Sequence, residues 1–112
     1  MNPTLKKQIE KTLALTFSDF KNEEETLNFL KSFLTDKELE TLSKRLSVLY
    51  WLSKKRTQEN IKNNLHVTSK FISENENLLN KKEVKEVVKK IDADAWATKW
   101  SSRLRELLKT KN

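Results

Sequence analysis

Apolar side chains recur at three- to four-residue spacing along almost the whole chain, which is the period of a helix and not of a strand. The first such stripe follows Asn2 and Pro3, where proline suits the first turn because its missing N–H has no partner there anyway. We predict an all-α fold. The first stripe consists of Leu5, Ile9, Leu13, Phe17 and Phe20.

Capping residues predict where the next two helices begin. Asn22 with Glu25, and Thr35 with Glu38, have the spacing of a capping box, in which two side chains satisfy free N–H groups reciprocally. The helix after Thr35 should end at the cations 54–56, because positive charge is favourable at the negative C-terminal end of a helix. The helix after Asn22 is expected to bury Leu27, Leu30, Phe33 and Leu34. The helix after Thr35 is expected to bury Leu39, Leu42, Leu46, Leu49 and Tyr50.

The C-terminal part is predicted to be a helical extension over residues 82–110, within a single domain of residues 1–112. A helix is expected from about Lys82, and Asp92 or Asp94 could cap a last one. The apolar positions of the first are Val84, Val87, Val88 and Ile91. Those of the second are Trp96, Trp100, Leu104, Leu107 and Leu108.

Residues 57–79 have the layout of a helix-turn-helix, two short helices joined by a tight turn. Thr57 and Thr68 each precede a helical run and can act as N-caps. The chain contains no glycine, so His66 occupies the turn position that needs positive φ. His66 is therefore interpreted as a turn residue and not as a metal ligand or base. The expected core of the motif is Ile61, Leu65, Val67, Phe71, Ile72, Leu78 and Leu79.

A helix-turn-helix predicts binding of double-stranded DNA, with the second helix in the major groove. Yet residues 57–80 carry two lysines and three glutamates, so most of the basic excess lies beside the motif and at the C-terminus. The predicted exposed face of the second helix also includes Glu74 and Glu76. Candidates for base contacts are Ser69, Lys70, Ser73, Asn75 and Asn77. Candidates for phosphate contacts are Lys54, Lys55, Arg56, Lys62 and Lys70, the run 54–56 being otherwise a solvated helix end.

The composition of the chain excludes several classes of protein and of chemistry. The chain has 112 residues, a net charge of +7 and no cysteine, so a disulfide framework and thiolate chemistry are excluded. Its apolar runs are too short to span a membrane, and its start lacks a secretory signal, so we expect a cytoplasmic protein. No nucleophile–base pair, metal cluster or phosphate loop is visible. We therefore expect no enzyme, no catalytic residue, no metal and no cofactor.

The string FLTDKELETLSKRLSVLYWLSKKRTQENIKNNLHVTSKFIS resembles the tryptophan-repressor superfamily, especially its bacterial branch of repressor-like proteins. The resemblance runs from about Glu24 to Leu79. It implies a helical fold, an intertwined homodimer and a motif helix that enters the major groove. In the repressor proper, a threonine and an arginine at the positions of Thr35 and Arg45 help to bind the tryptophan corepressor. Without the resemblance, Thr35 would be only a capping residue and Arg45 a surface or salt-bridge residue.

The same resemblance implies that free L-tryptophan is a doubtful effector. A second arginine of the repressor sandwiches the indole ring, and with a one-residue deletion near Arg56 its place falls at Glu74. A carboxylate there would repel the carboxylate of the amino acid. Trp51, Trp96 and Trp100 are expected in the core or in a dimer contact, although Trp96 and Trp100 share a face on which a base could stack.

Three functions follow from the sequence. The favoured one is a DNA-binding transcriptional regulator of the helix-turn-helix type, acting as a homodimer. The second is a helical protein-interaction module that kept the fold and lost DNA binding, which would suit the acidic second helix. The third is a non-specific RNA or DNA binder that uses the basic C-terminal segment.

Overall fold

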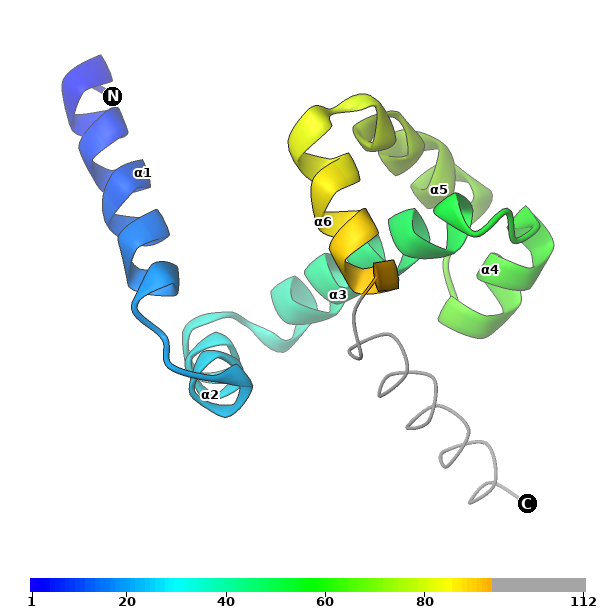
Figure 1. Ribbon diagram of the computed structural model, residues 1–112, viewed down its shortest axis with the longest axis horizontal. Helices are drawn as coiled ribbons and strands as arrows, with labels where there is room; N and C mark the ends of the chain where they lie inside the picture. Colours follow the sequence, from blue (N-terminus) through cyan, green and yellow to red (C-terminus); the bar gives the residue numbers. More distant parts are fainter. Residues whose placement is uncertain (94–112) are drawn as a thin grey trace. The chain divides into compact units, whose positions relative to one another are not determined.

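The computed structural model describes residues 1–93, which form six α-helices and one short 3₁₀ helix (Figure 1). No strand occurs in this range, so the all-α prediction is confirmed. The predictions for Asp94 and for the tryptophan-bearing helix with Trp96 and Trp100 lie outside the described residues. The contacts divide the chain into two compact units, residues 1–41 and the part from Leu42 onward. The single-domain assignment stays a prediction.

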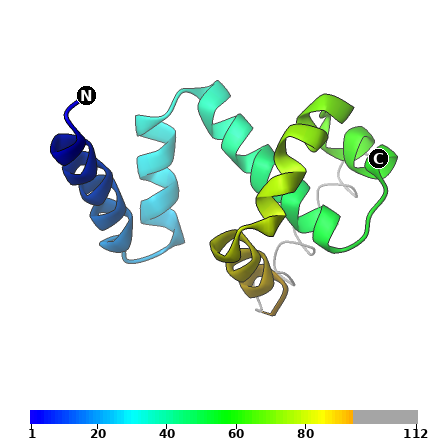
Figure 2. The same cartoon turned by 90° about the horizontal axis from the view of Figure 1, so that it is seen from above.

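The first unit contains α1 (Pro3–Ser18) and α2 (Glu23–Phe33), which run antiparallel as a helical hairpin (Figure 2). Asn2 caps α1 by accepting from the N–H groups of Thr4 and Leu5, at 2.8 and 3.3 Å. Asn22 caps α2 by accepting from the N–H of Glu25 at 2.9 Å. Both helix starts are as predicted. Four phenylalanine rings join the hairpin, with centroid separations of 5.0–6.0 Å: Phe17, Phe20, Phe29 and Phe33.

The helix α3 (Asp36–Ser53) begins in the first unit and continues into the second. Its start is the predicted capping box: the N–H of Glu38 donates to the Thr35 hydroxyl at 3.1 Å, and the N–H of Thr35 donates to the Glu38 carboxylate at 2.8 Å. Hydrogen bonding to the Glu38 carboxylate favours its ionised form and lowers its pKa, chiefly through the Thr35 N–H and then through the Thr35 hydroxyl.

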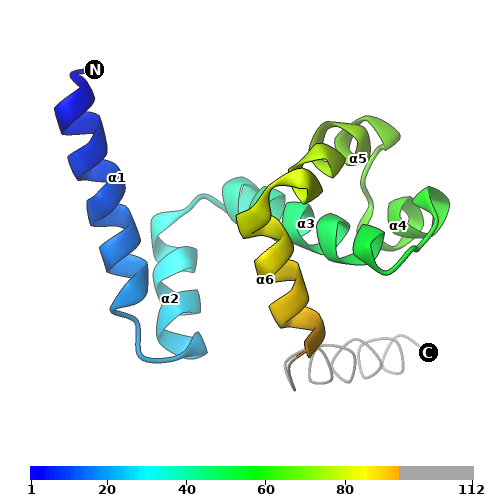
Figure 3. The same ribbon diagram turned by 45° about the horizontal axis from the view of Figure 1, so that its top comes forward.

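The second unit packs α4 (Gln58–Leu65) and α5 (Ser69–Glu76) against the C-terminal half of α3. The 3₁₀ helix η1 (Asn77–Asn80) then leads from α5 into α6 (Lys82–Ala93), as Figure 3 shows. Val48, Trp51, Ile61 and Ile72 form the core cluster, so the predicted core position of Trp51 is confirmed. Five partly buried side chains surround it: Tyr50, Leu52, Leu65, Val67 and Phe71.

Two parts of the predicted core are wrong. On α2, Leu27 and Phe33 were expected to be buried, but they are 40% and 62% exposed, and an apolar pair on α3 differs in the same way. Leu42 and Leu46 were expected to point inward, but they are 45% and 39% exposed in the single chain. The buried residues of α3 are Val48, Leu49 and Trp51. The motif packs against the C-terminal half of the helix, so the apolar pair one and two turns earlier faces solvent.

Candidate nucleic-acid interface

The predicted helix-turn-helix is present, and local hydrogen bonds define both of its helices. Thr57 caps α4 by accepting from the Asn60 N–H at 3.1 Å. Thr68 caps α5 by accepting from the Phe71 N–H at 3.0 Å. Ile61 on α4 and Ile72 on α5 are fully buried, so one apolar contact from each helix joins the pair. The second helix of the motif ends at Glu76, and Leu78 and Leu79 lie in the 3₁₀ helix that follows it.

The turn adopts the left-handed conformation at His66, with φ 53° and ψ 51°. This is the position that the sequence assigned to positive φ. The ammonium group of Lys44 donates to the carbonyl oxygen of His66 at 3.4 Å, which ties α3 to the turn. A non-glycine residue is strained in this region, so the surrounding contacts hold the turn in place.

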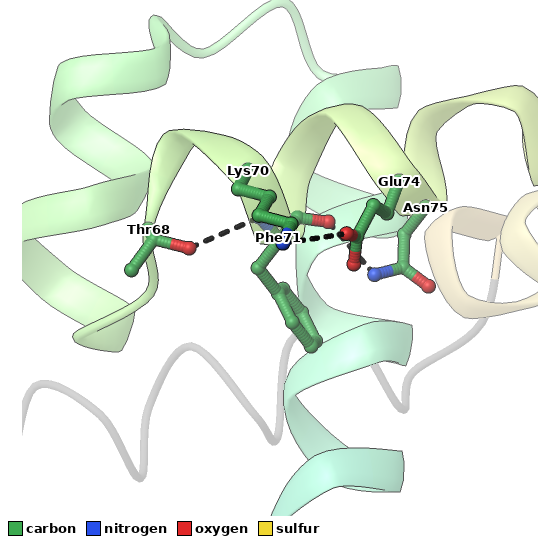
Figure 4. Close-up of polar contacts among 5 residues, drawn as sticks. All are labelled: Thr68, Lys70, Phe71, Glu74 and Asn75. Carbon is green, nitrogen blue, oxygen red and sulfur yellow. Dashed lines mark hydrogen bonds and ion pairs between the residues drawn. The ribbon is translucent and has the colours of Figure 1, made fainter.

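The outer face of α5 presents the candidate base contacts Ser69, Lys70 and Ser73, all exposed, and exposed Asn77 follows in η1. The Lys70 ammonium lies 3.9 Å from the Glu74 carboxylate, one helical turn on (Figure 4). Both side chains are well exposed, so this ion pair contributes little to stability. It does, however, place a carboxylate beside a cation that a phosphate would otherwise attract.

Asn75 was expected on the exposed face, and that expectation is wrong. The residue is only 7% exposed. Its side-chain amide donates to the Phe71 carbonyl at 2.8 Å, and its oxygen accepts from the Arg45 Nε at 3.0 Å (Figure 4 shows the first of these bonds). Both polar groups of the amide are therefore engaged inside the protein. Asn75 is a link between α3 and α5 and is no longer a candidate for reading bases.

A spacing in the sequence could have revealed this. Asn75 lies four residues after Phe71 and three after Ile72, so it falls on the buried stripe of α5. An asparagine is expected at the surface unless a partner for its amide is known, because buried polar groups need hydrogen bonds. Here the partner, Arg45, is 30 residues away in the sequence.

The candidate phosphate contacts 54–56 follow the end of α3, and the structure shows an unpredicted feature there. Lys55 has φ 63°. The N–H of Lys55 donates to the Leu52 carbonyl at 3.0 Å, and the N–H of Arg56 donates to the Trp51 carbonyl at 3.2 Å. This is the Schellman pattern, with lysine in the place where glycine is usual. It turns the chain sharply into the cap of α4.

Arg56 is held in a fixed position at the start of α4. Its guanidinium group lies 4.4 Å from the centre of the Trp51 ring, and its Nη1 donates to the Asn60 side chain at 3.1 Å. The Lys54 ammonium lies 5.9 Å from the Tyr50 ring. Lys62, the remaining candidate on α4, is exposed. Aromatic rings thus order two of the cations that flank the motif.

The two candidate effector-pocket residues have partners of their own. The Thr35 hydroxyl serves the capping box of α3, and Arg45 donates to Asn75. Within residues 1–93 no three His, Cys, Asp or Glu side chains gather as metal ligands. None of the described helices has the length and apolar character needed to cross a membrane.

The family model described as Trp repressor protein matches residues 8–91, well over half of the 112 residues. The match includes all of α3, both helices of the helix-turn-helix and most of α6. No curated protein and no solved structure matches the chain. The helix-turn-helix geometry and the extent of the family match agree: this chain belongs to the Trp repressor family.

Proposed function

We propose that this protein is a DNA-binding transcriptional regulator that acts as a homodimer. The helix-turn-helix supports the proposal most directly: α4 and α5 are capped, share a buried contact and leave the outer face of α5 exposed. A helix so presented has the size to enter the major groove, where base edges differ in their donors and acceptors. Such a regulator would act in the cytoplasm.

In this proposal, one group of side chains contacts DNA bases and another group contacts phosphates. Ser69, Ser73 and Asn77 are exposed and can exchange hydrogen bonds with base edges, and Lys70 can contact a base or a phosphate. The phosphates are contacted by Lys54, Lys55, Arg56 and Lys62. The stacked Arg56 has an advantage among these, because its guanidinium group is already ordered before binding.

Exposed apolar residues support the homodimer. On α1, three side chains at four-residue intervals are each nearly half exposed: Leu5, Ile9 and Leu13. Leu42 and Leu46 form a second exposed apolar pair on α3. Contiguous apolar stripes of this kind are uncommon on monomers, and they are covered when two copies associate.

Selection from a pool of random duplexes tests the function. We expect the wild-type protein to enrich one duplex sequence. The S69A/S73A/N77A variant should lose that preference with little change in salt dependence, since base contacts specify where phosphate contacts position. As a matched control, K54Q/K55Q should bind all duplexes more weakly and keep the preference. Failure of the wild-type protein to enrich any sequence would contradict the proposal.

A helical interaction module is the second candidate, and the charges of α5 favour it. Glu74 forms an ion pair with Lys70, and Glu76 adds a further exposed carboxylate. A face with this balance repels phosphate. Gel shifts with random duplex at low and moderate salt separate the two candidates, because an interaction module would give no shift at either.

A further inference from the structure

The helix α6 separates apolar and basic side chains onto two faces. Val88 is buried, and Val84 and Ile91 are partly buried, so these residues form the inner face. Four exposed lysines lie beside that face. We call them the basic face of α6: Lys81, Lys82, Lys85 and Lys89.

The helical period places these four lysines together. Lys81, Lys85 and Lys89 are four residues apart, and Lys82 lies seven residues before Lys89. At about 100° per residue, all four fall within an arc of roughly 100°. The Lys81 carbonyl accepts from the Lys85 N–H at 3.0 Å, so Lys81 is the N-cap residue that directly precedes the first turn of α6. Glu83 and Glu86, the carboxylates at the start of α6, lie outside this arc.

These lysines are arranged unfavourably for the isolated helix. Like charges four residues apart repel each other. Lys81, Lys82 and Lys85 also stand at the N-terminal end, where the helix dipole is positive and favours anions. Among residues 1–91, no carboxylate lies within ion-pair distance of the four ammonium groups. An external anion would relieve both effects.

The basic face contrasts with the motif. On α5 the single lysine, Lys70, is paired with Glu74, and Glu76 adds a further exposed carboxylate. The four lysines of the basic face therefore form a local concentration of positive charge that the outer face of α5 lacks. Along the axis, Lys81, Lys85 and Lys89 are about 6 Å apart, given 1.5 Å per residue. One DNA strand carries one phosphate per roughly 3.4 Å of duplex axis, so flexible lysines at this interval can reach several phosphates if α6 runs along the duplex.

We propose that the basic face of α6 is a second, sequence-independent contact with the phosphate backbone of duplex DNA. It supplies much of the electrostatic affinity, whereas the outer face of α5 supplies the sequence preference. This inference rests on the proposed function in taking DNA as the ligand. A row of lysines suits phosphate because each carries a compact, rotatable point charge.

The test replaces Lys81, Lys82, Lys85 and Lys89 by glutamine in the full chain. Its control replaces four exposed lysines of the first unit, Lys6, Lys7, Lys11 and Lys21, and so removes the same charge. Fluorescence anisotropy with a 30-base-pair duplex, from about 50 to 300 mM salt, measures the slope of log K against log salt. We expect the magnitude of that slope to fall by up to about 3.6 in the α6 variant, since each phosphate contact contributes about 0.9. In the control the slope should change far less.

Thermal unfolding at low salt gives a second readout. Removing the mutual repulsion should raise the melting temperature of the α6 variant, so stability and DNA affinity change in opposite directions. An unchanged slope, or a loss equal to that of the control, would overturn the inference even if the melting temperature rose. Affinity confined to an RNA duplex of the same length would overturn the assignment to DNA.

The inference and the proposed function fail separately. If the α6 variant keeps its slope while the wild-type protein selects a duplex sequence, only the basic face is refuted. If the slope falls as expected but no sequence is ever selected, the basic face stands as a non-specific DNA contact and the regulator is refuted.

Discussion

At the scale of single residues, the described part of the chain makes two left-handed turns without glycine. His66 has φ 53° in the turn of the motif, and Lys55 has φ 63° at the end of α3. An L-residue with a Cβ is strained in this region by about 1–2 kcal/mol. The two strained residues lie on either side of α4, so they fix how that helix enters and leaves the motif.

Glycine at either position should therefore stabilise the protein. We expect H66G and K55G each to raise the free energy of unfolding by up to about 1 kcal/mol, since the relief of strain is partly offset by the greater freedom of glycine in the unfolded chain. Chemical denaturation measures the change. The control K55A keeps a Cβ and should show no such gain. A loss of stability in both glycine variants would contradict the strain argument.

Glu38 should contribute to the acid sensitivity of the protein. Hydrogen bonding from Thr35 lowers the pKa of Glu38 in the folded state. The ionised carboxylate therefore stabilises the folded protein at pH values above the ordinary glutamate pKa. This stabilisation is lost as the pH falls through the lowered folded-state pKa. The wild-type protein should thus lose more stability than E38Q between about pH 5 and pH 3. Denaturation curves across this range measure it, and equal losses would contradict the prediction.

At the scale of elements, one side-chain link fixes α5 on α3. The Arg45 Nε donates to a buried amide, Asn75, which in turn donates to the Phe71 carbonyl. A buried polar group that loses its partner costs more than the hydrogen bond contributes, so each residue depends on the other. Together with the buried contact of Ile72, this pair holds the proposed recognition helix against α3.

A double-mutant cycle on Arg45 and Asn75 measures the link. We expect N75A alone to cost about 1–3 kcal/mol, and R45M to add less in the double variant than it costs alone, because the interaction is already lost. The exposed neighbour provides the control: N77A should stay within about 0.5 kcal/mol. Strictly additive effects would mean that the two side chains do not support each other.

At the scale of the whole molecule, the described helices leave much apolar surface in water. The α1 helix has no buried residue, although Leu5, Ile9 and Leu13 share one face. Leu42 and Leu46 are also exposed on α3. A second copy of the chain is the partner that would cover these stripes in the proposed homodimer.

Sedimentation equilibrium should therefore give about twice the 13.3 kDa of one chain at micromolar concentration. Lysines in the α1 stripe, I9K/L13K, should shift the protein toward the monomer, because two charges would have to be buried in the contact. L15K is the matched control, since Leu15 is exposed on another side of the helix. A wild-type monomer would refute the dimer.

Free L-tryptophan should not be a strong effector. Arg45 already donates to Asn75, the Thr35 hydroxyl serves a capping box, and Glu74 places a carboxylate where the family resemblance expects an arginine. Isothermal titration should show no dissociation constant below roughly 1 mM, about −4 kcal/mol. Micromolar binding would show that other cations complete a site.

The sequence by itself determined the helices, their caps and the helix-turn-helix, because these depend on neighbours three or four residues away. Thr57, Thr68 and His66 each act as the local pattern predicted. Only the tertiary structure decided which face of α3 is buried, since the side chains that cover it come from α4 and α5. It also decided what Asn75 pairs with. The spacing after Phe71 and Ile72 already places Asn75 on the buried stripe of α5, but its partner Arg45 is 30 residues away and no local spacing connects the two.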